Sequence, residues 1–217
     1  IFGGSLYFFT ENTALGITQA SNVSFIICTA PLLTTILSLL FYKSEKASKG
    51  LIYGSLLALM GVGLIVFNGS FVLKISPIGD LLTLLAALSW AFYSLIIKKM
   101  AGRYPTIFIT RKIFFYGVLT ILPAFLLHPL HPDTVVLLQP AVLFNLLFLA
   151  VLASLICYVL WNVVLKQLGT VRASNYIYLN PLVTMIASFL ILDEKITLVA
   201  LGGAACIVCG VYWAEKK

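Results

Sequence analysis

The stretch TQASNVSFIICTAPLLT at residues 18–34 shares its skeleton with VRASNYIYLNPLVT at residues 171–184. In both stretches an apolar run containing a serine leads to Pro-Leu and then to a threonine. Aligning Pro31 with Pro181 sets an offset of 150 residues, and residues on both sides then match as well. The further pairs are Asn12/Asn162, Leu15/Leu165, Ser24/Ser174, Ile27/Ile177, Thr34/Thr184 and Ser38/Ser188.

After one deleted residue the match continues at an offset of 149 residues. Because proline, Glu-Lys and two glycines recur in the same order, we predict an internal repeat. The pairs at this offset are Glu45-Lys46 with Glu194-Lys195, Gly54 with Gly203, and Gly61-Val62 with Gly210-Val211.

The composition predicts a protein embedded in a lipid bilayer. Of 217 residues, 61% are hydrophobic and only 10% are charged, whereas a soluble domain has about 25% charged residues. We predict an all-α integral membrane protein, since the apolar runs lack the alternation of barrel strands and lipid tolerates only helices or closed barrels. Eight spans are expected, each near the ~17–25 residues that a helix needs to cross the bilayer. They are 1–17, 21–42, 50–68, 79–97, 107–127, 141–165, 173–192 and 197–214.

The net charge of +7 is distributed unevenly between the two sides of the membrane. When alternate loops are assigned to opposite sides, twelve of the fourteen Lys and Arg residues share one side, and only Lys74 and Lys195 lie on the other. The positive-inside rule places the larger group and the C-terminus in the cytoplasm, and we expect the inner (plasma) membrane of a bacterium as the location. This distribution explains the basic pI without a nucleic-acid partner. The twelve are Lys43, Lys46, Lys49, Lys98, Lys99, Arg103, Arg111, Lys112, Lys166, Arg172, Lys216 and Lys217.

The repeat unit contains five helices, because the first three spans match the last three across the offset. Five is an odd number, so the second copy is expected to be inverted in the membrane. The fourth and fifth spans have no upstream counterpart, so two further helices are expected before Ile1. The expected protein has ten helices in two inverted halves. Residues 1–68 would be the last three helices of the first half and residues 78–214 the complete second half.

Inverted repeats and broken helices are typical of secondary transporters, whose site lies near the midplane between the halves. Pro31 and Pro181 each remove a backbone hydrogen bond within an expected span. Their recurrence favours kinks that line a cavity, and simple packing kinks are the alternative, because proline is tolerated in membrane helices.

Over essentially its whole length the chain resembles the drug/metabolite transporter superfamily, of the EamA type. The resemblance rests on residues 20–31 with Glu45 and Gly61, and again on Ala173-Ser174, Pro181, Glu194, Gly203 and Gly210. It also rests on Gly79-Asp80, Ser89-Trp90-Ala91 and Lys98-Lys99. The resemblance implies ten helices with both ends in the cytoplasm, a central cavity between two five-helix halves, and transport of small organic solutes. The chain departs from that pattern because the first two helices are missing.

Glu11 is the strongest candidate for a functional ionisable group. It lies ~12 Å below the outer end of the first expected span, near the middle of a hydrocarbon core ~30 Å thick. An ionisable group at that depth is costly and usually faces a cavity or a partner. We therefore predict a proton-coupling or cation-binding carboxylate. A structural glutamate, or one at a wet rim, is the alternative.

Several polar and aromatic side chains are candidates to line the substrate cavity. A buried asparagine is costly unless it is paired, so it can bind a solute or equally join two helices. Aromatic side chains within a span suit an amphipathic or aromatic solute, and core packing is the alternative. Tyr176 and Asn180 are four residues apart, hence on one helix face. The candidates are Asn12, Asn22, Trp90, Tyr93, Trp161 (the counterpart of Glu11), Asn162, Asn175, Tyr176 and Asn180, together with Pro31 and Pro181.

Neither a cofactor nor a metal site is expected. Cys206 and Cys209 form a CxxC in the last span, where cysteine serves as a small apolar residue, and the histidines of HPLHP at 128–132 have too few companions for metal. The GxxxG at Gly50 and Gly54 is typical of close helix packing, as is a small-residue stripe at Gly202, Cys206 and Gly210. Such faces are candidate homodimer contacts.

The predicted function is secondary transport of a small organic metabolite or drug. Transport would proceed by alternating access between the inverted halves, with Glu11 as the candidate for proton coupling and without enzymatic chemistry. Two alternatives remain open. A lipid or lipid-linked sugar flippase needs a lateral opening between helices, and a lipid-processing enzyme subunit needs clustered acids, histidines or a metal site.

Overall fold

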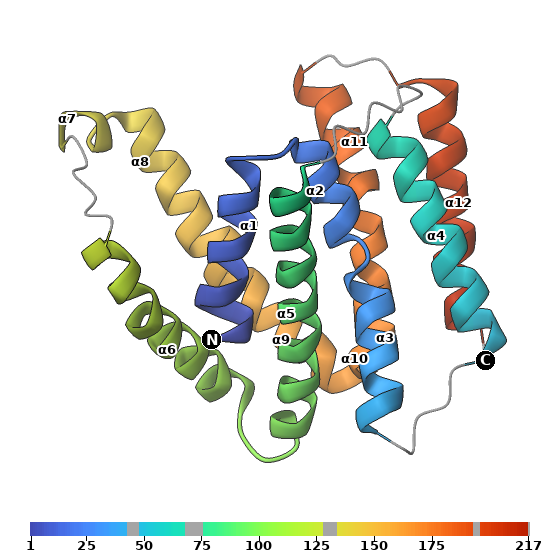
Figure 1. The fold of residues 1–217 in the computed structure, drawn as a ribbon, viewed down its shortest axis with the longest axis horizontal. Helices are drawn as coiled ribbons and strands as arrows, with labels where there is room; N and C mark the ends of the chain where they lie inside the picture. The colour runs from blue at the N-terminus through green and yellow to red at the C-terminus, as the bar shows by residue number, and fades with distance from the viewer. Residues whose placement is uncertain (43–47, 68–75, 128–133, 193–195, 217) are drawn as a thin grey trace.

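The computed structural model is a bundle of helices, with no strand in the residues it describes (Figure 1). These residues are 1–42, 48–67, 76–127, 134–192 and 196–216. Glu45-Lys46, Glu194-Lys195 and the HPLHP segment therefore lie outside the described residues.

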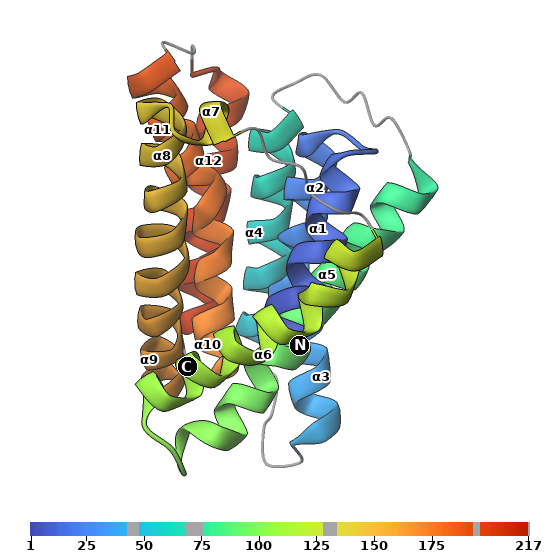
Figure 2. The same ribbon diagram turned by 90° about the vertical axis from the view of Figure 1, so that its left-hand side faces the viewer.

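Seven of the described helical segments are long and apolar enough to cross a membrane. Helices α5 and α1 lie in the middle of the bundle (Figure 1). Helix α6 runs obliquely across one face of the bundle (Figure 2). The seven are α2–α3 (Ala20–Ile27 and Ala30–Phe41), α4 (Lys49–Phe67), α5 (Pro77–Ala101), α6 (Thr106–Leu127), α8–η2–α9 (Pro140–Leu147, Phe148–Ile156 and Cys157–Leu168), α10–η3–α11 (Thr170–Asn175, Tyr176–Leu179 and Asn180–Leu192) and α12 (Leu198–Glu215). The short α7 (Thr134–Leu137) precedes α8.

The first expected span is shorter in the structure than the sequence predicts. It consists of a π-helical turn, η1 (Phe2–Leu6), and a nine-residue helix, α1 (Tyr7–Leu15). Gly3 and Gly4 leave helical backbone angles, in keeping with the low helix propensity of glycine. Together η1 and α1 run from Phe2 to Leu15, about 21 Å at 1.5 Å per residue, less than the ~30 Å hydrocarbon core. The described residues thus contain seven full spans and this shorter helix in place of the eight spans expected.

Helix boundaries recur at the same two offsets as the matched residues of the sequence. The longer offset, which aligns Pro31 with Pro181, relates the starts of two pairs of helices and the ends of the two π-helical turns. The shorter offset relates the starts of α4 and α12. The similarity between the two parts of the sequence is therefore accompanied by similarity in where the backbone bends. The paired starts are Ala20 (α2) with Thr170 (α10), Ala30 (α3) with Asn180 (α11) and Lys49 (α4) with Leu198 (α12), and the paired ends are Leu6 (η1) with Ile156 (η2).

Both expected breaks occur immediately before the matched prolines. The chain leaves α2 at Cys28 and Pro31 stands in the first turn of α3, where its missing N–H costs nothing because that group has no helical partner. In the matched segment downstream, the 3₁₀ turn η3 precedes α11, whose second residue is Pro181. Pro31 and Pro181 are both buried.

Helices α4 and α12 run side by side in opposite directions and meet through glycines (Figure 1). A Cβ on Gly203 would lie 2.7 Å from the carbonyl oxygen of Gly61, and a Cβ on Gly210 would lie 2.5 Å from that of Gly54. The two backbones are therefore too close for any side chain at these positions, as is typical of membrane helices.

This contact confirms the close helix packing expected of the Gly50/Gly54 face but not its use as a homodimer contact. A Cβ on Gly50 would lie 2.9 Å from the carbonyl oxygen of Trp213, so the Gly50/Gly54 face is covered by α12 of the same chain and is not open to a second copy. A Cβ on Gly202 would meet nothing within 4 Å, so the stripe on α12 runs through Gly203 and Gly210 instead.

The described lysines gather at one end of the bundle. The start of α4 and the ends of α5, α9 and α12 all lie at the lower end in Figure 1. Lys98 and Lys99 are in the last turn of α5, and Lys166 is in the last turn of α9. We refer to this as the basic end.

Candidate functional site

Five aromatic side chains from three helices form the centre of the candidate site. The Trp90 ring centroid on α5 lies 5.1 Å from Tyr7, 5.2 Å from Tyr93, 5.7 Å from Trp161 and 5.9 Å from Tyr158. Tyr7 comes from α1, and Tyr158 and Trp161 come from α9. We call these five residues the aromatic cluster. The sequence-predicted Trp90, Tyr93 and Trp161 therefore come together.

Glu11 is connected to this cluster through Tyr7. The Tyr7 hydroxyl donates a hydrogen bond of 2.9 Å to Glu11 Oε1, and the half-buried Glu11 keeps its other oxygen for a further partner. Since α1 ends at Leu15, Glu11 lies about 6 Å from the end of its helix at 1.5 Å per residue.

Hydrogen bonds connect the aromatic cluster to the neighbouring helices. The Tyr93 hydroxyl donates to Asn162 Oδ1 at 2.7 Å, and Asn162 Nδ2 donates to Thr110 Oγ1 at 2.9 Å. The Tyr158 hydroxyl donates to the Gly3 carbonyl at 2.7 Å. These bonds join α5, α6, α9 and η1, so Asn162 is a positioning residue that fixes the orientation of Tyr93.

Two indole N–H groups in the cluster have no acceptor. Among the described residues, neither Trp90 Nε1 nor Trp161 Nε1 has a hydrogen-bond partner, although both atoms are buried. A buried donor without an acceptor costs about 1–3 kcal/mol. Core packing alone gives no reason for two such donors within one cluster, whereas a polar ligand or water would satisfy both.

We expect Asn162→Ala to destabilise the protein by about 1–3 kcal/mol, because the buried hydroxyl of Tyr93 and that of Thr110 lose a shared partner. The repeat supplies the control, since Asn12 is the matched asparagine but is exposed. Asn12→Ala should leave the melting temperature nearly unchanged. Thermal unfolding of both variants in detergent measures the difference, and equal Tm values would contradict the role of Asn162.

A second group of buried polar side chains lies between α3, α4 and α10. Asn175 is fully buried, and Ser55 Oγ donates to its Oδ1 over a long 3.5 Å. Among the described residues, Asn175 Nδ2, Thr34 Oγ1, Ser174 Oγ and Tyr178 Oη have no partner. Asn22, on α2, is also buried. Asn22 and Asn175 are therefore enclosed in the protein, as a site or a helix contact requires.

Three predicted site residues are on the exposed surface. Asn12 and Asn180 are exposed, and Tyr176 is 40% exposed. The 3₁₀ turn of η3 alters the helical spacing on which the shared face of Tyr176 and Asn180 was based. Tyr178 is the buried tyrosine of this segment.

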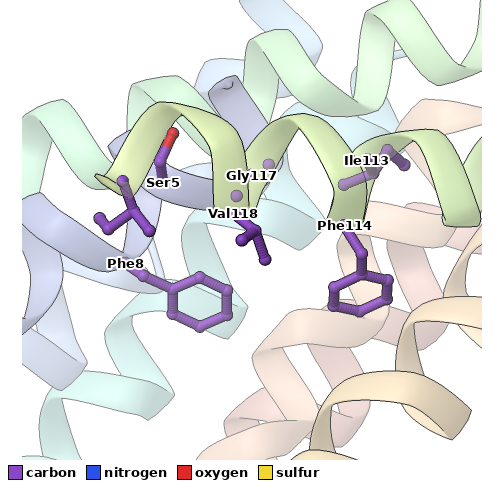
Figure 3. Close-up of a pocket in the computed structure, with 9 residues that line it drawn as sticks. Ser5, Phe8, Ile113, Phe114, Gly117 and Val118 are labelled. Atoms are coloured by element: carbon purple, nitrogen blue, oxygen red, sulfur yellow. The ribbon is translucent and has the colours of Figure 1, made fainter. Parts of the chain in front are cut away.

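Grooves open around the described helices, and Tyr93 is a predicted site residue that lines one of them. Figure 3 shows an apolar groove of 190 Å³ where η1 and α6 cross, with Phe8, Val118 and Phe114 projecting to the same side. A second, of 440 Å³, lies between η1, α5 and α6, and Tyr93 and Lys112 are among its lining residues. The aromatic cluster is thus a packed site bordered by an open groove at Tyr93.

Sequence reasoning missed Tyr7, Thr110 and Tyr158. Tyr7 precedes Glu11 by four residues, and Tyr158 precedes Trp161 and Asn162 by three and four. These spacings place the residues on one helix face, and this signal could have identified both tyrosines. Thr110 is on a different helix from Asn162, and no spacing in the sequence predicts that contact.

The described residues contain no group of three His, Cys, Asp or Glu side chains that could hold a metal ion. Cys206 is half-buried and Cys209 is exposed, and both are free thiols. Among the described residues, the side chains of the candidate site are suited to aromatic contacts and hydrogen bonding.

Seven apolar helical segments long enough to cross a bilayer indicate an integral membrane protein. The chain belongs to the EamA-like transporter family, which matches residues 1–67 and 77–214. This confirms the resemblance noted in the sequence.

The relatives are named as transporters. An uncharacterized transporter of Archaeoglobus fulgidus is 30% identical over 99% of this chain and 73% of its own length. A probable amino-acid metabolite efflux pump of Salmonella typhimurium is 29% identical over 79% of this chain and 60% of its own length. One solved crystal structure superposes with a TM-score of 0.83 at 18% identity, covering 99% of this chain and 72% of that one, which shows the fold.

Proposed function

We propose that the protein is a secondary transporter that moves a small organic solute by alternating access between two inverted halves of a ten-helix bundle. The recurrence of helix boundaries at the two offsets of the matched residues supports the repeat. The antiparallel glycine contact between α4 and α12 supports the inversion. Residues 1–68 belong to the first half and residues 78–214 are the second. The basic end faces the cytoplasm, in keeping with the positive-inside rule.

The solute binds between Glu11 and the aromatic cluster. The observation that carries this proposal is the pair of unsatisfied indole N–H groups in a cluster whose Tyr7 hydroxyl binds the Glu11 carboxylate, with residues from α1 of the first half and from α5 and α9 of the second. A site shared by both halves is what alternating access requires. Core packing explains the contacts between the rings but leaves both indole donors without an acceptor.

The chemistry of the site favours a solute with an amine and an apolar or aromatic body. Trp and Tyr faces attract a cation within about 6 Å of the ring centroid, and the Glu11 carboxylate complements the same charge. The indole donors suit a carboxylate or carbonyl of the solute. Relatives named as probable amino-acid metabolite efflux pumps are consistent with this solute class.

The test is a thermal-shift screen of the full-length protein with amino acids, nucleosides, sugars, cationic drugs and lipid-linked sugars. We expect an amine-bearing solute to raise Tm, and Trp90→Leu to weaken its apparent affinity about tenfold, which corresponds to ~1.4 kcal/mol. Trp213→Leu is the matched control, because Trp213 is 54% exposed near the end of α12. Stabilisation by lipid-linked sugars alone would favour a flippase, and equal affinities in the two variants would exclude the aromatic cluster as the site.

A further inference from the structure

A groove outside the aromatic cluster lies between the end of α3 and the last turns of α5. Its volume is 400 Å³, and it is bordered by three aromatic rings, two aliphatic side chains and one lysine. None of these lining side chains is acidic. They are Phe41, Tyr42, Phe92, Leu95, Ile96 and Lys99.

The wall of this groove is built from specific contacts. The Tyr42 hydroxyl donates to the carbonyl oxygen of Leu95 at 3.1 Å, which fixes the end of α3 against α5. The ammonium of Lys98 lies 4.7 Å from the centroid of the Tyr42 ring. The Phe41 and Phe92 rings are 6.3 Å apart. The aromatic wall is therefore held in place without a ligand.

Along the axis of α5 the groove changes from a lysine at the basic end to apolar side chains further in. Lys98 and Lys99 are in the last turn of α5, at the basic end, while Phe92 lies two turns earlier, about 10 Å deeper along a helix. Phe41 is 65% exposed and Ile96 is 43% exposed, so no described helix covers the groove. The groove therefore has the Lys99 ammonium at the basic end and apolar side chains along the rest of its length.

We propose that this groove binds one anionic phospholipid from the leaflet at the basic end. The lipid phosphate pairs with Lys99, beside Lys98, and the first part of an acyl chain lies against Phe92, Leu95 and Ile96. Basic pockets between membrane helices on the cytoplasmic side are suited to such headgroups. The apolar floor favours this ligand over free phosphate, and a lining with a lysine and no acidic side chain favours a net negative headgroup over one that also carries a cationic amine.

A lipid bound in this groove would also affect how α3 and α5 associate. It would contact the end of α3 and the end of α5, which are joined here by the hydrogen bond from Tyr42 to Leu95. Bound lipid would therefore stabilise the association of these two helices. This site is independent of the proposed solute and of Glu11.

Native mass spectrometry of the full-length protein in detergent tests the site, with phosphatidylglycerol and phosphatidylcholine of identical acyl chains as probes. We expect wild type to retain one phosphatidylglycerol several-fold more than phosphatidylcholine. Lys99→Gln should lower that preference at least threefold, and Ile96→Trp should lower retention of phosphatidylglycerol by filling the groove. Lys166→Gln is the matched control, because Lys166 is an exposed lysine at the same end of the bundle and lines none of the grooves described. Glycerol phosphate, the headgroup without chains, should not compete.

The proposal is overturned if the two lipids are retained equally, or if Lys166→Gln has the same effect as Lys99→Gln, which would indicate attraction by the overall charge. Competition by glycerol phosphate at the concentration of the lipid would also overturn it, because the acyl chain would then contribute nothing. Since Lys99 and Ile96 are both exposed, their variants should fold.

Discussion

Gly61→Ala is expected to destabilise the protein by about 1–3 kcal/mol, the cost of overpacking a tightly packed contact. A Cβ at this position would lie 2.5 Å from the carbonyl oxygen of Gly203 and 2.8 Å from the backbone nitrogen of Ile207. Both obstacles are backbone atoms of α12, so no side-chain rotation relieves the clash and the helices must separate. The larger Gly61→Leu should abolish the folded, monodisperse protein.

Gly202 provides the control for this experiment. It lies on α12 next to Gly203, and a Cβ there would meet nothing within 4 Å. Gly202→Ala should leave Tm unchanged or raise it, because alanine favours a helix by up to about 1 kcal/mol over glycine. Size-exclusion profiles and thermal unfolding in detergent measure both variants. A stable Gly61→Ala protein would show that α4 and α12 do not meet at these glycines.

Glu11→Gln is expected to remove the pH dependence of solute binding and to reduce proton-driven transport on the order of tenfold or more, ~1.4 kcal/mol per factor of ten. A carboxylate that pairs with a solute amine loses this attraction when it is protonated, so wild-type affinity should fall on acidification. Glutamine keeps an acceptor oxygen for the Tyr7 hydroxyl but carries no charge at any pH. The fold should therefore survive while the coupling is lost.

Solute binding at two pH values and solute-driven proton movement in proteoliposomes measure this effect. Glu215→Gln, at the end of α12, is the control, because it removes a carboxylate from a different helix. If Glu11→Gln retains the pH dependence of wild type, Glu11 is a structural residue. The solute site would then be sought among the buried polar groups around Asn175 and Tyr178.

The internal repeat could be predicted from the sequence, because detecting it requires only the order of the residues and not their contacts in the folded protein. Matched Pro31 and Pro181 predicted where the helices break, and the breaks occur there. Proline acts through its own backbone, so its effect is local. The change of backbone angles at Gly3 and Gly4 was missed because hydropathy does not register two adjacent glycines.

The environments of matched side chains could not be predicted in this way. Asn12 and Asn162 occupy equivalent positions, yet Asn12 is exposed, whereas Asn162 is buried and bonded to Tyr93 and Thr110. The burial of a residue depends on which distant helix packs against it, and hydropathy carries no information about that partner. The same reasoning explains why Trp90 was predicted while its contact with Tyr7 was not.

The glycine contact between α4 and α12 has a consequence for the direction of transport. Gly54 and Gly203 are repeat counterparts, as are Gly61 and Gly210, so exchanging the two halves turns each contact into the other. In the proposed cycle these four glycines therefore do not favour one side of the membrane over the other. Any such preference must come from residues without a matching counterpart. Glu11, which has Trp161 as its equivalent in the second half, is one such residue.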